Sequence, residues 1–152
     1  MSTIVVGVDG TEASGRALRW AVHEAKLRGA TLHVVHTWPA PYAVLGPNPR
    51  MRSKYTVDVA DKEQRIAEEF VERELDEAGA YGVGIHIERE VVEAAPAPTL
   101  LAAAAGADLL VLGSSRHGPL ADVVLGAVGE ECVRHAPCPV VIVRSSRPPL
   151  SG

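Results

Sequence analysis

The sequence is poor in aromatic residues and contains no long hydrophobic run. Two Trp, three Tyr and one Phe among 152 residues leave Val, Leu, Ile and Ala to build the core, since 47% of the residues are apolar. Small aliphatic side chains suit a parallel sheet covered by helices. No apolar stretch reaches the roughly 18 residues of a membrane-spanning helix, and the N-terminus MSTIVVGVDG lacks the basic start of a secretory signal. We therefore expect no membrane span and a cytoplasmic protein.

Blocks of positive charge and closely paired cysteines are also missing. The net charge is −4 without any cluster of Lys and Arg, which argues against nucleic acid as a partner. Cys132 and Cys138 form no CxxC pair, so we expect free thiols in a reducing compartment rather than a disulfide or a metal site. The length favours one domain over residues 1–145, followed by a flexible, proline-containing tail over residues 146–152.

Hydrophobic periodicity divides most of the chain into alternating strands and helices. Continuous apolar runs predict buried parallel strands, and apolar residues at helical spacing predict amphipathic helices. Gly29 stands where a helix C-cap is expected. The predicted strands are 3–8, 30–38, 83–91, 109–112 and 140–143, and the predicted helices are 12–28, 58–78, 98–105 and one that begins near Gly126. The helix over 58–78 should have an acidic outer face and bury Ile66, Phe70, Val71, Leu75 and Ala78.

This alternation predicts an α/β fold of the Rossmann-like kind, a five-stranded parallel doubly wound sheet with helices on both faces. Each connection is long enough for a right-handed crossover. The two common strand orders are 2-1-3-4-5 and 3-2-1-4-5. The strand over 83–91 alternates between apolar and polar residues, so it should lie near an edge. Residues 39–57 hold four prolines without periodicity and predict a long loop.

The stretch 108–144 contains a strand, a loop bounded by Gly113 and Gly118, a helix that begins near Gly126, and a last strand. A strand that leads into a Gly and Ser loop and then into a helix turns backbone N–H groups and a helix N-terminus toward the same space. Such an arrangement binds anions. The stretch therefore predicts a phosphate-binding site.

The same stretch resembles the universal stress proteins, whose fingerprint is G-x2-G-x9-G-[S/T] between the last two strands of a small α/β domain. Gly113 and Gly126 match this fingerprint, whereas Arg116 and Ala127 stand where its second glycine and its hydroxyl residue occur. The flanking segments ADLLVLGS, LGAV and CVRHAPCPVVIVR look like that family. The resemblance covers residues 2–144 and implies the strand order 3-2-1-4-5.

The resemblance implies a sensor or regulator of the stress response that binds ATP, with or without Mg²⁺, or a related nucleotide such as AMP or cyclic AMP. In the order 3-2-1-4-5 the first and fourth strands are neighbours, and ligands bind where their helices leave on opposite faces. A turn and helix cap is the alternative role for residues 9–12. The implied nucleotide-binding residues are Asp9, Thr37 (where Val is usual), Leu112, Gly113, Ser114, Arg116, Gly126, Ala127 and Val128.

The two departures from the fingerprint bear directly on binding. Arg116 places a long side chain where phosphate oxygens would pass, so it either blocks the site, swings outward or pairs with the phosphates. Ala127 lacks the hydroxyl donor, and losing a hydrogen bond to a charged group weakens binding about ten- to a hundredfold. Both departures favour an alternative function, a nucleotide-free module of the same family that dimerises or docks onto another protein.

Catalysis is not expected beyond slow ATP hydrolysis, because the sequence offers no acid, base and metal constellation of the kind phosphoryl transfer uses. We predict no catalytic residues and no metal site. His117 has no nucleophile or metal partner at fixed spacing, and His33 and His36 should lie on opposite faces of a strand as structural residues. An adenylating enzyme would need a Ser- and Gly-rich loop directly after the first strand, which residues 9–12 do not supply.

The last predicted strand, 140–143, is apolar throughout, and an exposed apolar edge strand promotes aggregation. Something is expected to cover it. The family resemblance implies a homodimer in which this strand pairs with its twin across a two-fold axis, with Pro139, Val141 and Val143 near the interface.

Overall fold

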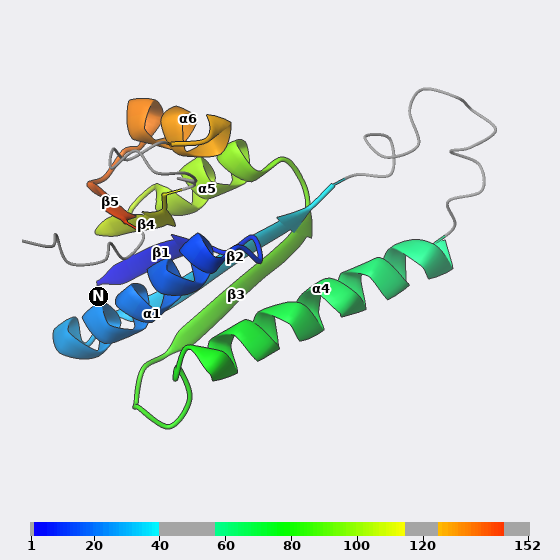
Figure 1. The fold of residues 1–152 in the computed structure, drawn as a ribbon, viewed down its shortest axis with the longest axis horizontal. Helices are drawn as coiled ribbons and strands as arrows, with labels where there is room; N and C mark the ends of the chain where they lie inside the picture. Colours follow the sequence, from blue (N-terminus) through cyan, green and yellow to red (C-terminus); the bar gives the residue numbers. More distant parts are fainter. Residues whose placement is uncertain (1, 40–56, 115–124, 145–152) are drawn as a thin grey trace, which may run out of the picture.

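The computed structural model describes residues 2–39, 57–114 and 125–144, which form one α/β unit (Figure 1). Most of the predicted loop over 39–57, Arg116 and His117, and the predicted tail over 146–152 lie outside the described residues. The elements along the chain are β1 (Thr3–Gly7), α1 (Glu12–Arg28), β2 (Thr31–Trp38), α4 (Val57–Glu77), β3 (Ile87–Glu93), α5 (Pro96–Ala104), β4 (Leu109–Gly113), α6 (Ala127–His135) and β5 (Val140–Val143).

The five strands form one parallel sheet in the order β3-β2-β1-β4-β5. β1 is central because it pairs with β2 in the register Thr3↔Thr31 and with β4 in the register Ile4↔Leu109. The predicted fold class and the order 3-2-1-4-5 are confirmed, and the order 2-1-3-4-5 is excluded. β3 lies at one edge, as its alternating pattern indicated, and β5 lies at the other.

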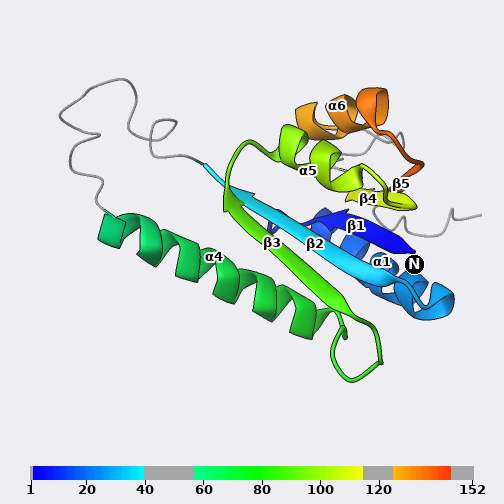
Figure 2. The same cartoon turned by 180° about the vertical axis from the view of Figure 1, so that it is seen from behind.

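Helices cover both faces of the sheet, with α1 and α4 on one face and α5 and α6 on the other (Figures 1 and 2). Alternation along the strands divides the core accordingly. Ile4 and Val6 pack with α1 and α4 in one hydrophobic cluster, whereas Val5 packs with α5 and α6 in a second cluster. The two layers therefore meet the sheet from opposite sides, as a doubly wound fold requires.

Helix α1 has the bounds that its sequence predicts. The Thr11 side chain caps the helix by accepting a hydrogen bond from the Ser14 backbone N–H at 3.1 Å. Gly29 ends the helix in the left-handed region with φ 64°. Both signals lie in the local sequence, which explains why the prediction succeeded.

Two glycines of α1 should respond oppositely to alanine. Gly29→Ala should lower the free energy of unfolding by about 1 kcal/mol, because a Cβ is strained at positive φ even where no neighbouring atom lies within 4 Å. Gly15→Ala should raise it by about 0.5–1 kcal/mol, because Gly15 is inside the helix and a Cβ there meets only the Arg19 side chain, at 3.7 Å. Urea unfolding measures both values, and equal shifts in the same direction would contradict this account.

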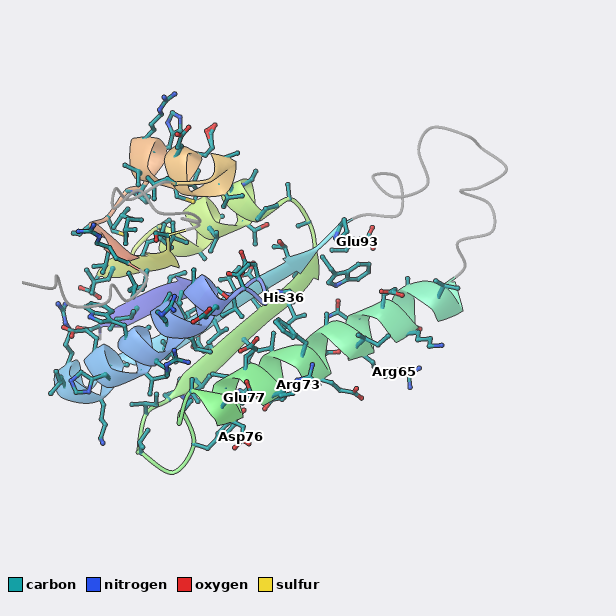
Figure 3. All side chains as sticks on the ribbon, in the orientation of Figure 1. His36, Arg65, Arg73, Asp76, Glu77 and Glu93 are labelled. Carbon is teal, nitrogen blue, oxygen red and sulfur yellow. The ribbon has the colours of Figure 1, made fainter. Side chains whose placement is uncertain are left out.

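Helix α4 differs from its predicted face at one position. Phe70, Val71, Leu75 and Ala78 pack toward the core as predicted, but Ile66 is 51% exposed. Ala67 is buried in its place, because Ala67, Val71 and Leu75 follow the spacing of four that stays on one helix face. Acidic residues outnumber basic ones along the helix, and Arg65, Arg73, Asp76 and Glu77 are exposed (Figure 3).

The predicted strand over 83–91 was placed too early, since β3 begins at Ile87 and ends at Glu93. Gly82 and Gly84 have φ of 76° and 80°, which belong to a turn and not to a strand. The apparent alternation of Val83 and Ile85 therefore arises in the connection that precedes β3. Helix α5 also begins earlier than predicted, at Pro96, because proline is well accommodated in the first turn of a helix.

Candidate functional site

The described residues enclose a pocket of about 700 Å³ at the carboxyl end of the sheet. β1 and β4 are adjacent there, and their helices α1 and α6 lie on opposite faces of the sheet. A crevice at such a point is the usual ligand site of an open α/β sheet. The lining residues are Gly7, Val8, Asp9, Thr11, Ala13, Ser14, Val35, Thr37, Pro39, Ala94, Ala95, Pro96, Leu100, Leu112, Gly113, Gly126, Ala127, Val128 and Gly129.

Most of the predicted nucleotide-binding residues meet in this pocket. Ser114 follows Gly113 directly but does not line the pocket, and Arg116 lies outside the described residues. A part in ligand binding stays a prediction for all of them. The seven that line the pocket are Asp9, Thr37, Leu112, Gly113, Gly126, Ala127 and Val128.

The turn after β1 fixes Asp9 at the pocket wall. Oδ1 of Asp9 accepts hydrogen bonds from the Thr11 backbone N–H at 2.9 Å and from the Thr11 hydroxyl at 2.6 Å. The Asp9 backbone N–H in turn donates to Ser14 Oγ at 3.2 Å, and Gly10 provides the positive φ of 87° that the turn requires. The turn-and-cap role is therefore confirmed. Oδ2 of Asp9 has no hydrogen-bond partner among the described residues and is available as an acceptor.

Gly113 ends β4 where the first turn of α1 passes over the strand. A Cβ at this position would lie 2.4 Å from the backbone oxygen of Ala13 and 2.5 Å from its carbonyl carbon. Only glycine therefore permits α1 to pack this closely on β4. The family resemblance implies that Gly113 binds the nucleotide, and the contact with Ala13 adds a packing requirement for glycine at this position.

Three helix N-termini contribute to the pocket wall, and they differ in free hydrogen-bond donors. α1 is capped by Thr11. α5 has no side-chain cap at Ala95, but Pro96 and Pro98 remove two N–H groups from its first turn. α6 has no side-chain cap at Gly126, and its first intrahelical hydrogen bond runs from Glu130 N to Gly126 O.

The N-terminus of α6 is therefore the donor-rich end of the pocket. The backbone N–H groups of Ala127, Val128 and Gly129 precede that first hydrogen bond, so they have no partner within the helix. All three residues line the pocket. The opposite end is apolar, with Val35, Leu100 and the N-terminal residues of α5 as its wall, and the half-buried Thr37 adds a hydroxyl there.

The residues that line the pocket from α5 and from β2 were missed by sequence reasoning, apart from Thr37. Ala94, Ala95 and Pro96 follow β3, whose predicted end at residue 91 was two residues short. The rule that ligands bind at the carboxyl ends of parallel strands would have pointed to them once the end of β3 was known.

The histidines of β2 have structural partners, as predicted. His36, which is labelled in Figure 3, donates from Nδ1 to the backbone oxygen of Val8 at 2.7 Å. Its ring lies 4.7 Å from the ring of Phe70 in α4. His33 Nε2 lies 3.2 Å from Glu90 on β3. His36 thus supports the end of β1 from the face opposite the pocket.

Among the described residues, the other reactive groups do not form a site. Cys132 and Cys138 are free, and burial raises the pKa of both thiols, which keeps them protonated at neutral pH. Within the described ranges, no group of three or more His, Cys, Asp or Glu side chains is placed to hold a metal ion. No helix in this part of the chain is long and apolar enough to cross a membrane.

The family model for the universal stress protein family matches residues 1–144. This chain belongs to that family. Universal stress protein Rv2005c of Mycobacterium tuberculosis is 34% identical over 142 residues, covering 93% of this chain and 48% of that protein. Universal stress protein Rv1996 of the same organism is 31% identical over 159 residues, covering 96% and 50%. This universal stress protein thus spans about half the length of the curated relatives it matches.

Solved structures confirm the fold. Universal stress protein UspA from Lactobacillus plantarum has a TM-score of 0.68 at 22% identity, over 94% of this chain and 97% of that chain. A universal stress protein solved in complex with cAMP has a TM-score of 0.64 at 26% identity, over 95% and 98%. The universal stress protein from Archaeoglobus fulgidus in complex with dAMP has a TM-score of 0.63 at 22% identity, over 93% and 97%.

Proposed function

We propose that this universal stress protein binds an adenine nucleotide in the pocket and acts as a cytoplasmic sensor or regulator of the stress response. The observation that carries the proposal is the polarity of the pocket, which is rich in N–H donors at α6 and apolar near β2 and α5. A volume of about 700 Å³ suits a small-molecule site. Two relatives of the same fold, described as complexes with cAMP and dAMP, support the choice of an adenine nucleotide.

The same polarity orients the ligand. The phosphate lies at the N-terminus of α6, where unpaired N–H groups and the helix dipole attract an anion. The base lies in the apolar end, near Val35, Thr37 and Leu100. Asp9 belongs to the turn after β1 and lines the pocket. Its Oδ2 has no partner in that turn and accepts a hydrogen bond from a sugar hydroxyl of the nucleotide.

The residues of the pocket favour a regulatory role for the bound nucleotide over its hydrolysis. Among the lining residues that the structure describes, Asp9 is the only acid, and Thr11 holds its Oδ1. With Oδ2 of Asp9 taken up by the sugar hydroxyl, a bound ATP, with or without Mg²⁺, would meet no free general base and would be hydrolysed slowly at most.

The alternative function is a nucleotide-free module that works by dimerising or by docking onto another protein. Arg116 and Ala127 favour it, because they replace the glycine and the hydroxyl residue of the family fingerprint. Ala127 lies at the first position of α6 and lines the pocket, so the missing hydroxyl is lost at the donor-rich end.

Isothermal titration with ATP and Mg²⁺, and with cyclic AMP in parallel, tests the two functions. We expect the natural protein to bind, and an Arg116→Gly, Ala127→Ser variant to bind about ten- to a hundredfold more tightly, because the variant regains a hydroxyl donor. Binding by the variant alone would support the nucleotide-free module. Failure of both proteins to bind would contradict the proposed nucleotide site.

We further propose a homodimer formed through β5, with Pro139, Val141 and Val143 near the interface. The edge position of β5 supports the proposal, as do its four apolar residues, which are all half-buried in the single chain. The backbone oxygen of Pro139 accepts a hydrogen bond from Leu110 of β4, and that of Val143 accepts one from Ser114, directly after β4. In a parallel edge strand, alternate residues turn their backbone N–H and C=O groups away from the sheet. A twin strand can form hydrogen bonds with these outward-facing groups.

Val143→Lys should shift the protein from dimer to monomer in sedimentation experiments at micromolar concentration, because a lysine on an edge strand opposes strand pairing. Ile66→Lys is the matched control, since Ile66 is an exposed aliphatic residue of α4, on the other half of the sheet. The control should stay dimeric. Circular dichroism verifies that both variants fold, and a natural protein that sediments as a monomer would disprove the homodimer.

A further inference from the structure

The hydrogen-bonded ladder between β1 and β2 ends at Val8, directly before the turn that carries Asp9. The register of the two strands runs to Gly7↔Val35, and the final hydrogen bond of the ladder runs from Val8 N to Val35 O at 2.9 Å. In a regular parallel ladder the next hydrogen bond would join Thr37 N to Val8 O. The ladder stops short of that pair, so the chain leaves the sheet after Val8, and Thr37 stays at the pocket wall.

The side chain of His36 supplies the donor that the ladder leaves out. Its Nδ1 donates to the backbone oxygen of Val8 at 2.7 Å, and Val8 is buried, with 4% exposure. A buried carbonyl oxygen needs a donor, and a side chain provides one without the strand spacing that a backbone donor imposes. His36 (labelled in Figure 3) therefore satisfies this oxygen and keeps it out of the ladder at the same time.

Phe70 of α4 packs behind both parts of this arrangement. Its ring lies 4.7 Å from the ring of His36 at an interplanar angle of 48°, which suits an aromatic pair. Its Cζ atom also lies 3.4 Å from the position that a Cβ on Gly10 would occupy. One side chain therefore supports the histidine and the turn together, and neither is free to shift toward α4.

The turn held in this way carries the one carboxylate among the described residues of the pocket wall, that of Asp9. Two hydrogen bonds fix its Oδ1 within the turn, and its Oδ2 is left as an acceptor. A group that already stands in its binding position gives higher affinity, because less conformational freedom is lost when the ligand binds. Since Asp9 follows Val8 directly, the position of Oδ2 depends on Val8 and, through it, on His36.

We infer that His36, with Phe70 behind it, is a positioning residue of the pocket: its hydrogen bond to Val8 O sets the position of the Asp9 carboxylate, and thereby the affinity for the sugar of the nucleotide. This inference rests on the proposed function. Neither His36 nor Phe70 is among the residues that line the pocket, so both act without touching the ligand. Their effect concerns the sugar alone and leaves the donors of α6 and the apolar wall unchanged.

Titration of the full chain with a nucleotide and with its 2′,3′-dideoxy analogue tests the inference, because the analogue lacks the sugar hydroxyls that Asp9 binds. The nucleotide is ATP with Mg²⁺ or AMP, whichever the natural protein binds more tightly. The natural protein should prefer it over the analogue by at least about tenfold. His36→Phe keeps a ring beside Phe70 but has no donor for Val8 O. It should lose about tenfold in affinity for the nucleotide and keep its affinity for the analogue, so the preference should fall to about twofold.

His36→Asn is the conservative variant, because its amide nitrogen is as many bonds from the backbone as Nδ1 of histidine and is also a donor. Its affinities should stay within about threefold of those of the natural protein. His33→Phe is the matched control. His33 belongs to the same strand, but it lies beside Val5 on the opposite face, and its partner is Glu90. The control should change neither affinity, and circular dichroism verifies that each variant folds.

The outcomes separate this inference from the proposed function. An unchanged preference in a folded His36→Phe protein would overturn the inference and leave the proposed function standing. Equal losses in His36→Phe and His36→Asn would also overturn it, because the donor would then have no part. Equal binding of nucleotide and analogue by the natural protein would disprove the contact of Asp9 with the sugar, and the inference with it. Binding of neither compound would overturn the proposed function as well.

Phe70→Leu gives a second test that leaves the histidine in place. The variant should lose a few-fold in affinity for the nucleotide and keep its affinity for the analogue, because the ring behind His36 and Gly10 is gone. Val71→Ala is its control, since Val71 is buried in the same helix and its truncation lowers stability without removing either contact. Equal losses of affinity in the two variants would show that the stability of α4, and not the contact with His36, sets the affinity.

Discussion

Gly113→Ala should lower the free energy of unfolding by about 2–4 kcal/mol, a large share of the stability of a domain of this size. The new Cβ would lie 2.4 Å from the backbone oxygen of Ala13, which cannot rotate away as a side chain can. Relief therefore requires α1 to move off β4, and the buried contacts between them weaken with it. Urea unfolding followed by circular dichroism measures the loss.

Gly7→Ala is the control for this prediction. A Cβ at Gly7 would meet Leu100 Cδ2 at 3.1 Å, and a leucine side chain can shift by a few tenths of an ångström. We expect a loss of about 1 kcal/mol or less there. A Gly113→Ala protein as stable as the Gly7→Ala protein, but unable to bind nucleotide, would return Gly113 to the ligand-contact role that its sequence context first indicated.

Local signals account for what the sequence predicted well. The Thr11 cap and the Gly29 terminator gave α1 its bounds because each acts through hydrogen bonds or backbone angles of neighbouring residues. The apolar run at 140–143 gave the bounds of β5 for a similar reason. Strand order is not local: composition and periodicity left two orders open, and the family resemblance supplied 3-2-1-4-5.

The errors have a common physical origin, which is information that sits in a distant contact or in a backbone angle. Ile66 and Ala67 are both apolar, and only the packing of α4 on the sheet decides that Ala67 is buried. Val83 and Ile85 alternate with polar residues as in a strand, but the left-handed angles of Gly82 and Gly84 place them in the connection before β3. The close contact between Gly113 and Ala13, which the sequence did not reveal, likewise joins residues that are remote in sequence.

The candidate site shows the same division. The fingerprint residues on β4 and α6 were found because they lie in one stretch of sequence that leads from a strand to a helix. The apolar end was largely missed because Val35 comes from β2 and Ala95 and Leu100 come from α5 with its N-cap, two elements that only the folded sheet brings together. The polarity of the pocket depends on both ends, because the unpaired N–H groups of α6 lie at one end and this apolar wall lies at the other.

Asp9→Ala should reduce nucleotide affinity about a hundredfold, because the variant loses an acceptor whose hydrogen bond to a sugar hydroxyl is charge-assisted and also loosens the turn that holds the pocket wall. The loss of the two hydrogen bonds from Thr11 to Oδ1 should also lower the free energy of unfolding by about 1–2 kcal/mol. Isothermal titration and urea unfolding of the same protein measure the two effects.

Thr11→Ala separates the cap from the ligand contact. It removes the hydroxyl that accepts from Ser14 N, so it should cost about 1 kcal/mol of stability, yet it leaves the Asp9 carboxylate and its bond from the Thr11 backbone N–H in place. Affinity should then fall by only a few-fold. If Thr11→Ala and Asp9→Ala weakened binding equally, Asp9 would act through the turn alone, and the pocket would recognise its ligand through α6 and the apolar wall.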